Sequence, residues 1–444
     1  MIRIRRMQHA PKRFSFIQPL LIWLTLAIGL MWLFQKQHTP QPEELLQAQP
    51  AHDHSYTQNL DGLGYLNYIR HQAGLPFLHY SPELTQAAGN HARYLTHYPN
   101  DGHDETQTQS PLFTGAELGD RVAHVGYAYQ GAQENISTIQ NSKGSPLPAP
   151  LPEHLHLDGL MTAIYHRFSL LDPSIDEAGV VMASSPQHQV LVVNQGSRIH
   201  QSLCRLGRQQ PQVARTYTVG LCRDNSLIYQ DEMPPRTNKA YVVYPVGDRA
   251  RTDFHNEIPN PMPEHEFTGN PVSIMFADHS PAVTMRAFRL YQTDTEQEIT
   301  PTHILTHQTD PNKLFTPHQF ALFPLQPLQY DTPYRAEFHY RQQGQNKIAT
   351  WQFRTKKPDY PYFSVQGGEK LAVESGKAYF VQWAGKPCRA DCASVNYRAR
   401  NHAELTLHGH EVDGLILSIT GERGSSVRVM RGKQDEQAVT LYIQ

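Results

Sequence analysis

The stretch SPELTQAAGNHARYLTH at residues 81–97 is the clearest fold signal in this 444-residue chain. Ser81 and Pro82 are typical of the start of a helix, because a capping hydroxyl is followed by a residue whose φ is already helical. Apolar side chains then recur at helical spacing, at Leu84, Ala87, Ala88, His91 and Leu95. The stretch therefore predicts an amphipathic helix with one buried face, on which His91 is expected to be a core histidine.

The sequence around this helix predicts further helices and then strands. An apolar pattern at helical spacing over 60–69 predicts a preceding helix, and a similar pattern over 157–168 predicts a following one. Apolar runs at 180–182 and 190–193 predict two strands joined by a short turn. Helices followed by strands in this order favour a compact α+β domain over residues 55–200.

The C-terminal half has a sequence pattern that is typical of β structure. Runs such as AYVVY at 240–244 and VSIMF at 272–276 predict a β domain over residues 238–356. Tyr334 lies just ahead of its last strands, which resembles the tyrosine corner of immunoglobulin-like and fibronectin-like sandwiches. Short strands separated by glycine-containing turns predict a second small β domain over residues 357–444.

Residues 1–36 combine a basic segment with a long apolar run. The run from Phe16 to Phe34 has no charged residue and approaches the ~20 helical residues that span a bilayer. Basic residues ahead of such a run keep that end in the cytoplasm and send the remainder across. We therefore expect a single-pass signal anchor over residues 16–34, with residues 37–54 as a tether outside the cytoplasm. The alternative is secretion after signal cleavage, although Trp32 and its neighbours make a poor cleavage site.

Charge and cysteine content restrict the partners and the compartment. The formal charge of -2 gives no electrostatic reason to expect a nucleic acid partner. Four cysteines occur as two pairs, Cys204 with Cys222 in a connector predicted over 201–237, and Cys388 with Cys392. An even count beyond a translocation signal favours disulfides. Zinc binding by the second pair is an open alternative, with downstream candidates His402, His408 and His410.

Four short polar segments in the first domain contain the candidate functional residues. These candidates are His103, Glu134, His166 and Glu177. Two imidazoles and two carboxylates can form a divalent-metal site or an acid–base pair if the fold brings them together. Their spacing in the sequence does not show that these residues lie together, because the chain can turn anywhere between the four segments.

Five short motifs follow one another along the same domain. They are LNYIR at 66–70, AAGNHA at 87–92, GH at 102–103, QENI at 133–136 and YHRFSLLDP at 165–173. Each motif is weak alone, but their order resembles that of bacterial CAP domains (cysteine-rich secretory protein, antigen 5, pathogenesis-related 1). The resemblance departs from the family pattern at Gln133, where the family motif has glycine.

The resemblance implies an α-β-α sandwich with a shallow cleft lined by two histidines and two acidic residues. Carried over motif by motif, it assigns His103, Glu134 and His166 to that cleft, with Glu177 as a fourth. His103 and His166 would be the ligands if a divalent metal such as zinc binds. Eukaryotic members take a second glutamate and a later histidine from motifs that this chain lacks. Next to the cleft, Arg167 and Asp172 are expected to form a structural pair at a helix end.

Three functions are compatible with these features in a bacterial cell membrane protein with periplasmic domains. The first is a binding module that holds a cell-envelope protein, lipid or polymer, which the absence of a nucleophile motif favours. The second is a metal-dependent hydrolase of peptides or envelope polymers, in which His103 or His166 binds metal or acts as base beside Glu134. The third is a structural spacer. The sequence does not decide whether the protein is an enzyme.

Overall fold

A computed structural model of the chain describes residues 3–6, 45–53, 55–57, 59–140, 151–233, 239–254, 257–266, 268–383, 394–411, 413–431 and 435–444. The chain divides into two compact units, residues 1–53 with 357–444 and residues 54–356. The expected membrane segment 16–34 and the pair Cys388 and Cys392 lie outside the described residues. Within the described ranges, no helix has the length and apolar character needed to cross a membrane.

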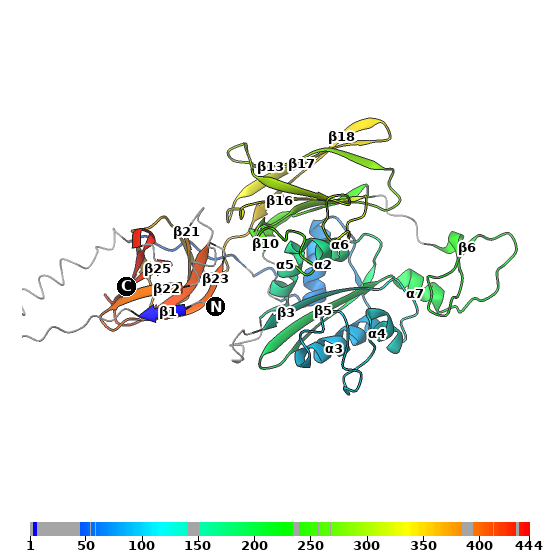
Figure 1. The fold of residues 1–444 in the computed structure, drawn as a ribbon, viewed down its shortest axis with the longest axis horizontal. Coiled ribbons are helices and arrows are strands. Elements are labelled where there is room, and N and C mark those ends of the chain that lie inside the picture. The colour runs from blue at the N-terminus through cyan, green and yellow to red at the C-terminus, as the bar shows by residue number, and fades with distance from the viewer. Residues whose placement is uncertain are drawn as a thin grey trace, which may run out of the picture. The chain divides into compact units, whose positions relative to one another are not determined.

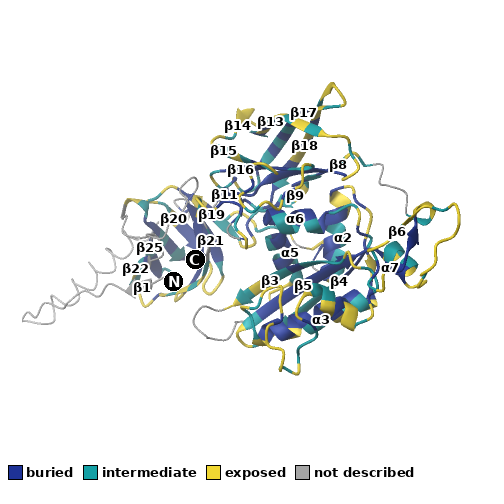
Figure 2. Ribbon diagram, turned by 45° about the vertical axis from the view of Figure 1, so that its right-hand side comes forward, coloured by how far each residue is buried: buried dark blue, intermediate teal, exposed yellow. Residues whose placement is uncertain are grey.

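The larger unit begins with an α-β-α arrangement (Figure 1). Its sheet has the strand order β2-β4-β5-β3, with β2 at His79–Tyr80, β3 at Gln133–Gln140, β4 at Glu177–Ser184 and β5 at His188–Gly196. The helices are α2 (Gly62–Gln72), α3 (Pro82–His97), α4 (Leu118–His124), α5 (Glu153–Thr162) and α6 (Ile164–Leu170). Figure 2 shows β5 buried along nearly its whole length between the two helical layers.

Alternation along β5 distributes its side chains between those layers. Leu191 and Val193 belong to the core formed with α2, α5 and α6, whereas Val190 and Val192 pack with α3. Successive side chains of a strand point to opposite faces, so one apolar strand serves both cores. Because β5 is covered on both faces, its sequence shows a continuous apolar run instead of an alternating one.

The helix α3 forms where the sequence predicts it. The Ser81 hydroxyl accepts the backbone N–H of Leu84, and the predicted face, including His91, is buried. Gly179 lets β4 approach the first turn of this helix, because a Cβ at Gly179 would lie 2.2 Å from the backbone nitrogen of Thr85. The start of α3 and the start of β4 are thereby held in direct contact.

The helix expected over 157–168 is two helices. The first, α5, ends at Thr162, and α6 begins at Ile164, because Ala163 has extended backbone with φ -76° and ψ 115°. The first N–H groups of a helix have no partner within the helix. The break therefore exposes the N–H groups of the YHR motif to a partner from elsewhere in the fold.

Residues 239–356 form a β-sandwich of two sheets with a shared aromatic core. One sheet has the order β15-β16-β12-β8 and the other β14-β13-β17-β18-β9. Their bounds are β8 Tyr241–Tyr244, β9 Gly247–Ala250, β12 Val272–Phe276, β13 Val283–Gln292, β14 Gln297–Glu298, β15 Thr302–Thr306, β16 Gln319–Pro324, β17 Pro333–Gln342 and β18 Gln345–Thr355. A small ladder of β10 (Asp253–Phe254) and β11 (Thr268–Gly269) lies between β9 and β12. Tyr334 is buried and its hydroxyl accepts the N–H of Gln329 at 2.9 Å, as in a tyrosine corner.

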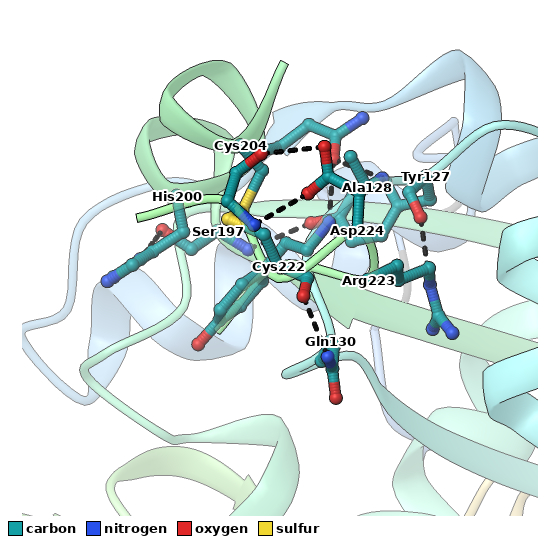
Figure 3. The surroundings of a disulfide bond; sticks show 12 residues. Tyr127, Ala128, Gln130, Ser197, His200, Cys204, Cys222, Arg223 and Asp224 are labelled. Atoms are coloured by element: carbon teal, nitrogen blue, oxygen red, sulfur yellow. Dashed lines mark hydrogen bonds between the residues drawn. A yellow bond between two sulfur atoms is a disulfide. The ribbon is translucent and has the colours of Figure 1, made fainter. Parts of the chain in front are cut away.

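A segment closed by a disulfide connects the α-β-α part to the sandwich. It contains α7 (Arg198–Cys204), β6 (Tyr217–Thr218) and β7 (Ile228–Tyr229), and Cys204 is bonded to Cys222 as predicted. Figure 3 shows Gln130 Nε2 donating to the carbonyl of Cys222 at 2.8 Å and the N–H of Arg223 meeting the carbonyl of Ala128 at 3.0 Å. The disulfide segment thus anchors the chain immediately before β3.

The smaller unit contains two sheets, β1-β22-β25-β26-β20 and β19-β21-β24-β23. Their bounds are β1 Arg3–Arg6, β19 Tyr362–Val365, β20 Lys370–Val373, β21 Tyr379–Trp383, β22 Ser394–Arg400, β23 Glu404–Glu411, β24 Gly414–Thr420, β25 Ser426–Arg431 and β26 Val439–Ile443. The strand β1 pairs in parallel with β22. This pairing requires both strands to lie on the same side of a membrane, whereas a single crossing at 16–34 would separate them.

Candidate functional site

Glu134, the second residue of β3, lies at the centre of a buried polar cluster. Its side chain is 2% exposed, and its Oε1 accepts from Arg121 Nη2 at 2.8 Å and from His103 Nδ1 at 3.0 Å. His91 Nε2 lies 3.9 Å from the same oxygen. With its amide nitrogen facing the cluster, Asn194 donates to Glu134 Oε2 at 3.1 Å. Both carboxylate oxygens therefore accept hydrogen bonds from side chains that lie in different parts of the domain.

These contacts keep Glu134 ionised. Burial raises the pKa of the Glu134 carboxyl, but the hydrogen bond from His103 and the charge of Arg121 outweigh burial and lower that pKa overall. An ionised carboxylate can only accept, so the proton of a neutral His103 ring must be on Nδ1. The ring, whose side chain is 54% exposed, then presents the lone pair of Nε2.

His166 reaches the same place from α6. Its ring centroid lies 6.5 Å from that of His103, and the two ring planes differ by 25°. Its Nδ1 lies 2.8 Å from Glu257 Oε1, and the Glu257 side chain is 0% exposed. Glu257 belongs to the β-sandwich, in the segment between β10 and β11. Glu257 Oε1 also accepts the backbone N–H groups of Tyr165 and His166, so this oxygen is an acceptor and the proton of neutral His166 lies on Nδ1.

The result is two imidazoles side by side, each held at Nδ1 by a buried carboxylate. Neither Nε2 has a hydrogen-bond partner in the part of the chain that the structure describes. Such atoms accept hydrogen bonds when the rings are neutral, donate them when the rings are protonated, or bind a cation. We call His103 and His166, with Glu134 and Glu257, the two-histidine site.

A metal ion fits this site only in part. Catalytic zinc sites use three protein ligands, and His103 with His166 supplies two. Across the described ranges, no group of three or more His, Cys, Asp or Glu side chains is arranged to hold a metal ion. The oxygens of Glu134 are occupied by Arg121, His103 and Asn194.

Glu177, the fourth residue expected at the site, makes a different contact. It is the first residue of β4, and its Oε1 accepts from the Tyr127 hydroxyl at 2.7 Å. Burial raises the pKa of Glu177. No contact among the described residues joins Glu177 to His103, Glu134 or His166. The fold thus brings three of the four expected residues together. The second carboxylate at the site comes from Glu257 and not from Glu177.

Arg167 differs from its expected pairing with Asp172. It is fully buried and points into the β-sandwich, where its Nη2 donates to Asn270 Oδ1 at 2.6 Å and its guanidinium lies 4.8 Å from the Tyr244 ring centroid. Asp172 instead accepts from Gln133 Nε2. Arg167, the residue after His166, therefore contacts the neighbouring domain and holds α6 against the sandwich.

Sequence reasoning missed Arg121 and Glu257 as members of this cluster. Arg121 lies in the short helix α4, outside the five motifs that assign residues to the site. His91 is buried as expected and bonds Glu105 and the carbonyl of Gly102, but it also borders Glu134. Glu257 lies in a loop of another domain with no motif around it, so no local signal could have indicated it.

Residues 63–195 match the family model described as CAP, the Cysteine-rich secretory protein family. The match confirms the resemblance seen in the motifs, and this part of the chain is a CAP domain. No curated protein matches the sequence.

Several solved structures resemble part of the chain. An extracellular protein containing an SCP domain from Bacillus anthracis str. Ames is 20% identical, with 30% of this chain and 38% of that chain covered and a TM-score of 0.23. An outer surface protein from Borrelia burgdorferi is 13% identical over 34% of this chain and 98% of that chain, with a TM-score of 0.26. Tandem immunoglobulin domains of titin are 12% identical, with 39% of this chain and 87% of that chain covered and a TM-score of 0.14. The chain thus spans only 38% of the Bacillus anthracis protein.

Proposed function

We propose that this protein is an extracytoplasmic binding module of the bacterial cell envelope and that it holds its ligand through His103 and His166. The observation that carries the proposal is the pair of unpartnered Nε2 atoms on two nearly parallel rings. Two fixed acceptors suit a ligand with several hydrogen-bond donors. We therefore favour a polymer rich in hydroxyl and amide groups over an envelope protein or a lipid.

Cosedimentation of the full chain with purified peptidoglycan tests this proposal. Binding is measured at about pH 8, above the ordinary imidazole pKa of about 6.5. His103→Gln and His166→Gln should each lower the bound fraction, whereas the exposed control His307→Gln should not. Failure of the wild-type chain to sediment, or equal binding by both site variants, would count against the proposal.

The proposed compartment rests on the sequence and on the disulfide. The Cys204–Cys222 bond supports a location outside the reducing cytoplasm. The basic segment and the apolar run at 16–34 support a membrane anchor, with secretion after cleavage as the alternative. The pairing of β1 with β22 agrees with neither arrangement, because an anchor at 16–34 leaves residues 3–6 in the cytoplasm and cleavage removes them.

Two measurements separate these arrangements. A reporter that is active only outside the cytoplasm, fused after Gln49, should be active, and the mature chain should retain its first residues. A mature chain that starts at about residue 40 would mean a cleaved signal. Labelling of an Ile4→Cys variant in intact cells by a membrane-impermeant maleimide would place β1 outside and contradict a cytoplasmic N-terminal segment.

A metal-dependent hydrolase of peptides or envelope polymers is the second candidate. It is favoured by the same pair of imidazole nitrogens, because imidazole is the commonest metal ligand in proteins. Titration of the full chain with Zn²⁺ in a calorimeter tests it. One stoichiometric site that is lost in both His103→Gln and His166→Gln would support the hydrolase, and the absence of such a site would oppose its metal-dependent form.

A further inference from the structure

Glu257 brings three donors to a single carboxylate oxygen. Its Oε1 accepts from His166 Nδ1 at 2.8 Å, from the backbone N–H of Tyr165 at 2.9 Å and from that of His166 at 3.1 Å. The residue before α6, Ala163, makes no side-chain capping hydrogen bond. The β-sandwich therefore supplies an acceptor that the CAP domain itself lacks at this helix.

The domain that carries Glu257 is tied to α6 on both sides of His166. On one side, Asn312 Nδ2 donates to the Tyr165 hydroxyl and to the carbonyl of Asn260, each at 2.9 Å. On the other side, Arg167 Nη2 donates to Asn270 Oδ1 at 2.6 Å. These contacts restrain the position of Glu257 relative to the ring that it holds.

One oxygen of Glu257 does not contribute to this packing. Its Oε2 is buried and has no hydrogen-bond partner in the described structure. Leaving a buried carboxyl oxygen without a partner costs free energy, and such atoms need an explanation beyond stability. The bond between the other oxygen, Oε1, and His166 Nδ1 gives this carboxyl group a role other than stability.

The relation between Glu257 and His166 repeats the relation between Glu134 and His103. A carboxylate at Nδ1 fixes both the tautomer and the orientation of an imidazole and leaves Nε2 as the acceptor. Without such a partner, a neutral imidazole distributes its proton between the two nitrogens and can rotate about its side-chain bonds.

We propose that Glu257 is a positioning residue that the β-sandwich contributes to the two-histidine site. The site is then a product of both domains of residues 54–356, one carboxylate coming from each, and is not complete in the CAP domain alone. This inference rests on the proposed function for what the site binds, but its geometry and its test require no ligand.

The test is the tautomer of His166, read from long-range ¹H–¹⁵N spectra of the full chain labelled at histidine. Spectra are recorded at about pH 8, above the ordinary imidazole pKa of about 6.5, and the His166 signals are identified by their loss in His166→Gln. The wild-type ring should carry its proton on Nδ1. Glu257→Ala should shift the proton toward Nε2, and Glu257→Gln should restore the wild-type pattern, because an amide oxygen still accepts from Nδ1–H.

Asp310→Asn is the matched control. Asp310 is as buried as Glu257 and binds α6 through the Tyr165 hydroxyl, but it does not touch an imidazole. This variant should leave the His166 tautomer unchanged. A wild-type ring protonated on Nε2, or an unchanged tautomer in Glu257→Ala, would overturn the proposal. If Glu257→Ala does not fold, the wild-type and Glu257→Gln spectra still decide it. Failure to bind peptidoglycan would refute the proposed function and leave this result standing.

Discussion

The rings of His103 and His166 lie with their centroids 6.5 Å apart and their planes 25° apart. Each ring is held at Nδ1 by a buried carboxylate, from Glu134 at 3.0 Å and from Glu257 at 2.8 Å. The two carboxylates come from different domains of the same unit. Each of the two neighbouring rings keeps an Nε2 atom without a hydrogen-bond partner among the described residues, and the proposed binding role depends on that relationship.

Removing the cation that pairs with Glu134 should destabilise the larger unit. Arg121→Ala leaves the Glu134 carboxylate buried without its charge partner, and breaking a buried ion pair in this way costs about 3–5 kcal/mol. Urea denaturation should show this loss in the free energy of unfolding. The control Glu296→Gln breaks a surface pair with Arg335 and should leave the midpoint unchanged. An Arg121→Ala midpoint equal to that of wild type would contradict the structure of the cluster.

Acid should weaken the same cluster. Burial raises the pKa of Glu134, but the His103 hydrogen bond and the Arg121 charge lower it overall. A carboxyl whose pKa is lowered by folding stabilises the protein above the unfolded value of about 4.3, and that stabilisation is lost as the pH falls through the lowered value. The difference in unfolding free energy between wild type and Glu134→Gln should therefore shrink below about pH 4. A constant difference between about pH 7 and pH 3 would rule out this linkage.

Arg167 should couple the CAP domain to the sandwich. Arg167→Ala removes hydrogen bonds from a buried guanidinium to Asn270 and to the carbonyl of Pro271, and each such bond contributes about 1.5–3 kcal/mol. Calorimetry should show a lower transition temperature and a separate transition for the two domains. Arg93→Ala, at an exposed arginine of α3, is the control and should change neither. A single unshifted transition in Arg167→Ala would be inconsistent with this coupling.

Loss of the disulfide should loosen the chain ahead of β3. The double substitution Cys204→Ser with Cys222→Ser should lower the unfolding free energy by about 2–4 kcal/mol. A thiol assay on the denatured wild-type chain also tests the second expected pair, Cys388 with Cys392. No free thiol is expected if both pairs are oxidised, and two free thiols would mean that the second pair is reduced.

The local parts of the fold could be predicted from the sequence. The helix α3 carries its own cap, its own helical periodicity and its own stop, so its bounds need no tertiary information. The break at Ala163 could not be predicted, because the apolar pattern continues across it. The break is instead stabilised from outside, where Glu257 accepts the N–H groups of Tyr165 and His166.

The candidate site could be predicted only in the part that depends on motif order. His103, Glu134 and His166 converge because the order of their motifs reflects the CAP fold. Glu177 precedes the strand predicted at 180–182, but the sequence does not indicate that its carboxylate meets Tyr127. Glu257 reaches the site through packing between domains, which leaves no local pattern in the sequence.

A double-mutant cycle on His103 and His166 tests the central claim most directly. The affinity of the full chain for purified peptidoglycan is measured at about pH 8 for wild type, His103→Gln, His166→Gln and the double variant. Because both rings are expected to act on one ligand group, each single variant should weaken binding and the double variant should lose little more than either one. This corresponds to a coupling energy of about 1 kcal/mol or more. Strictly additive losses, or no loss in the single variants, would contradict a site built from the two imidazoles.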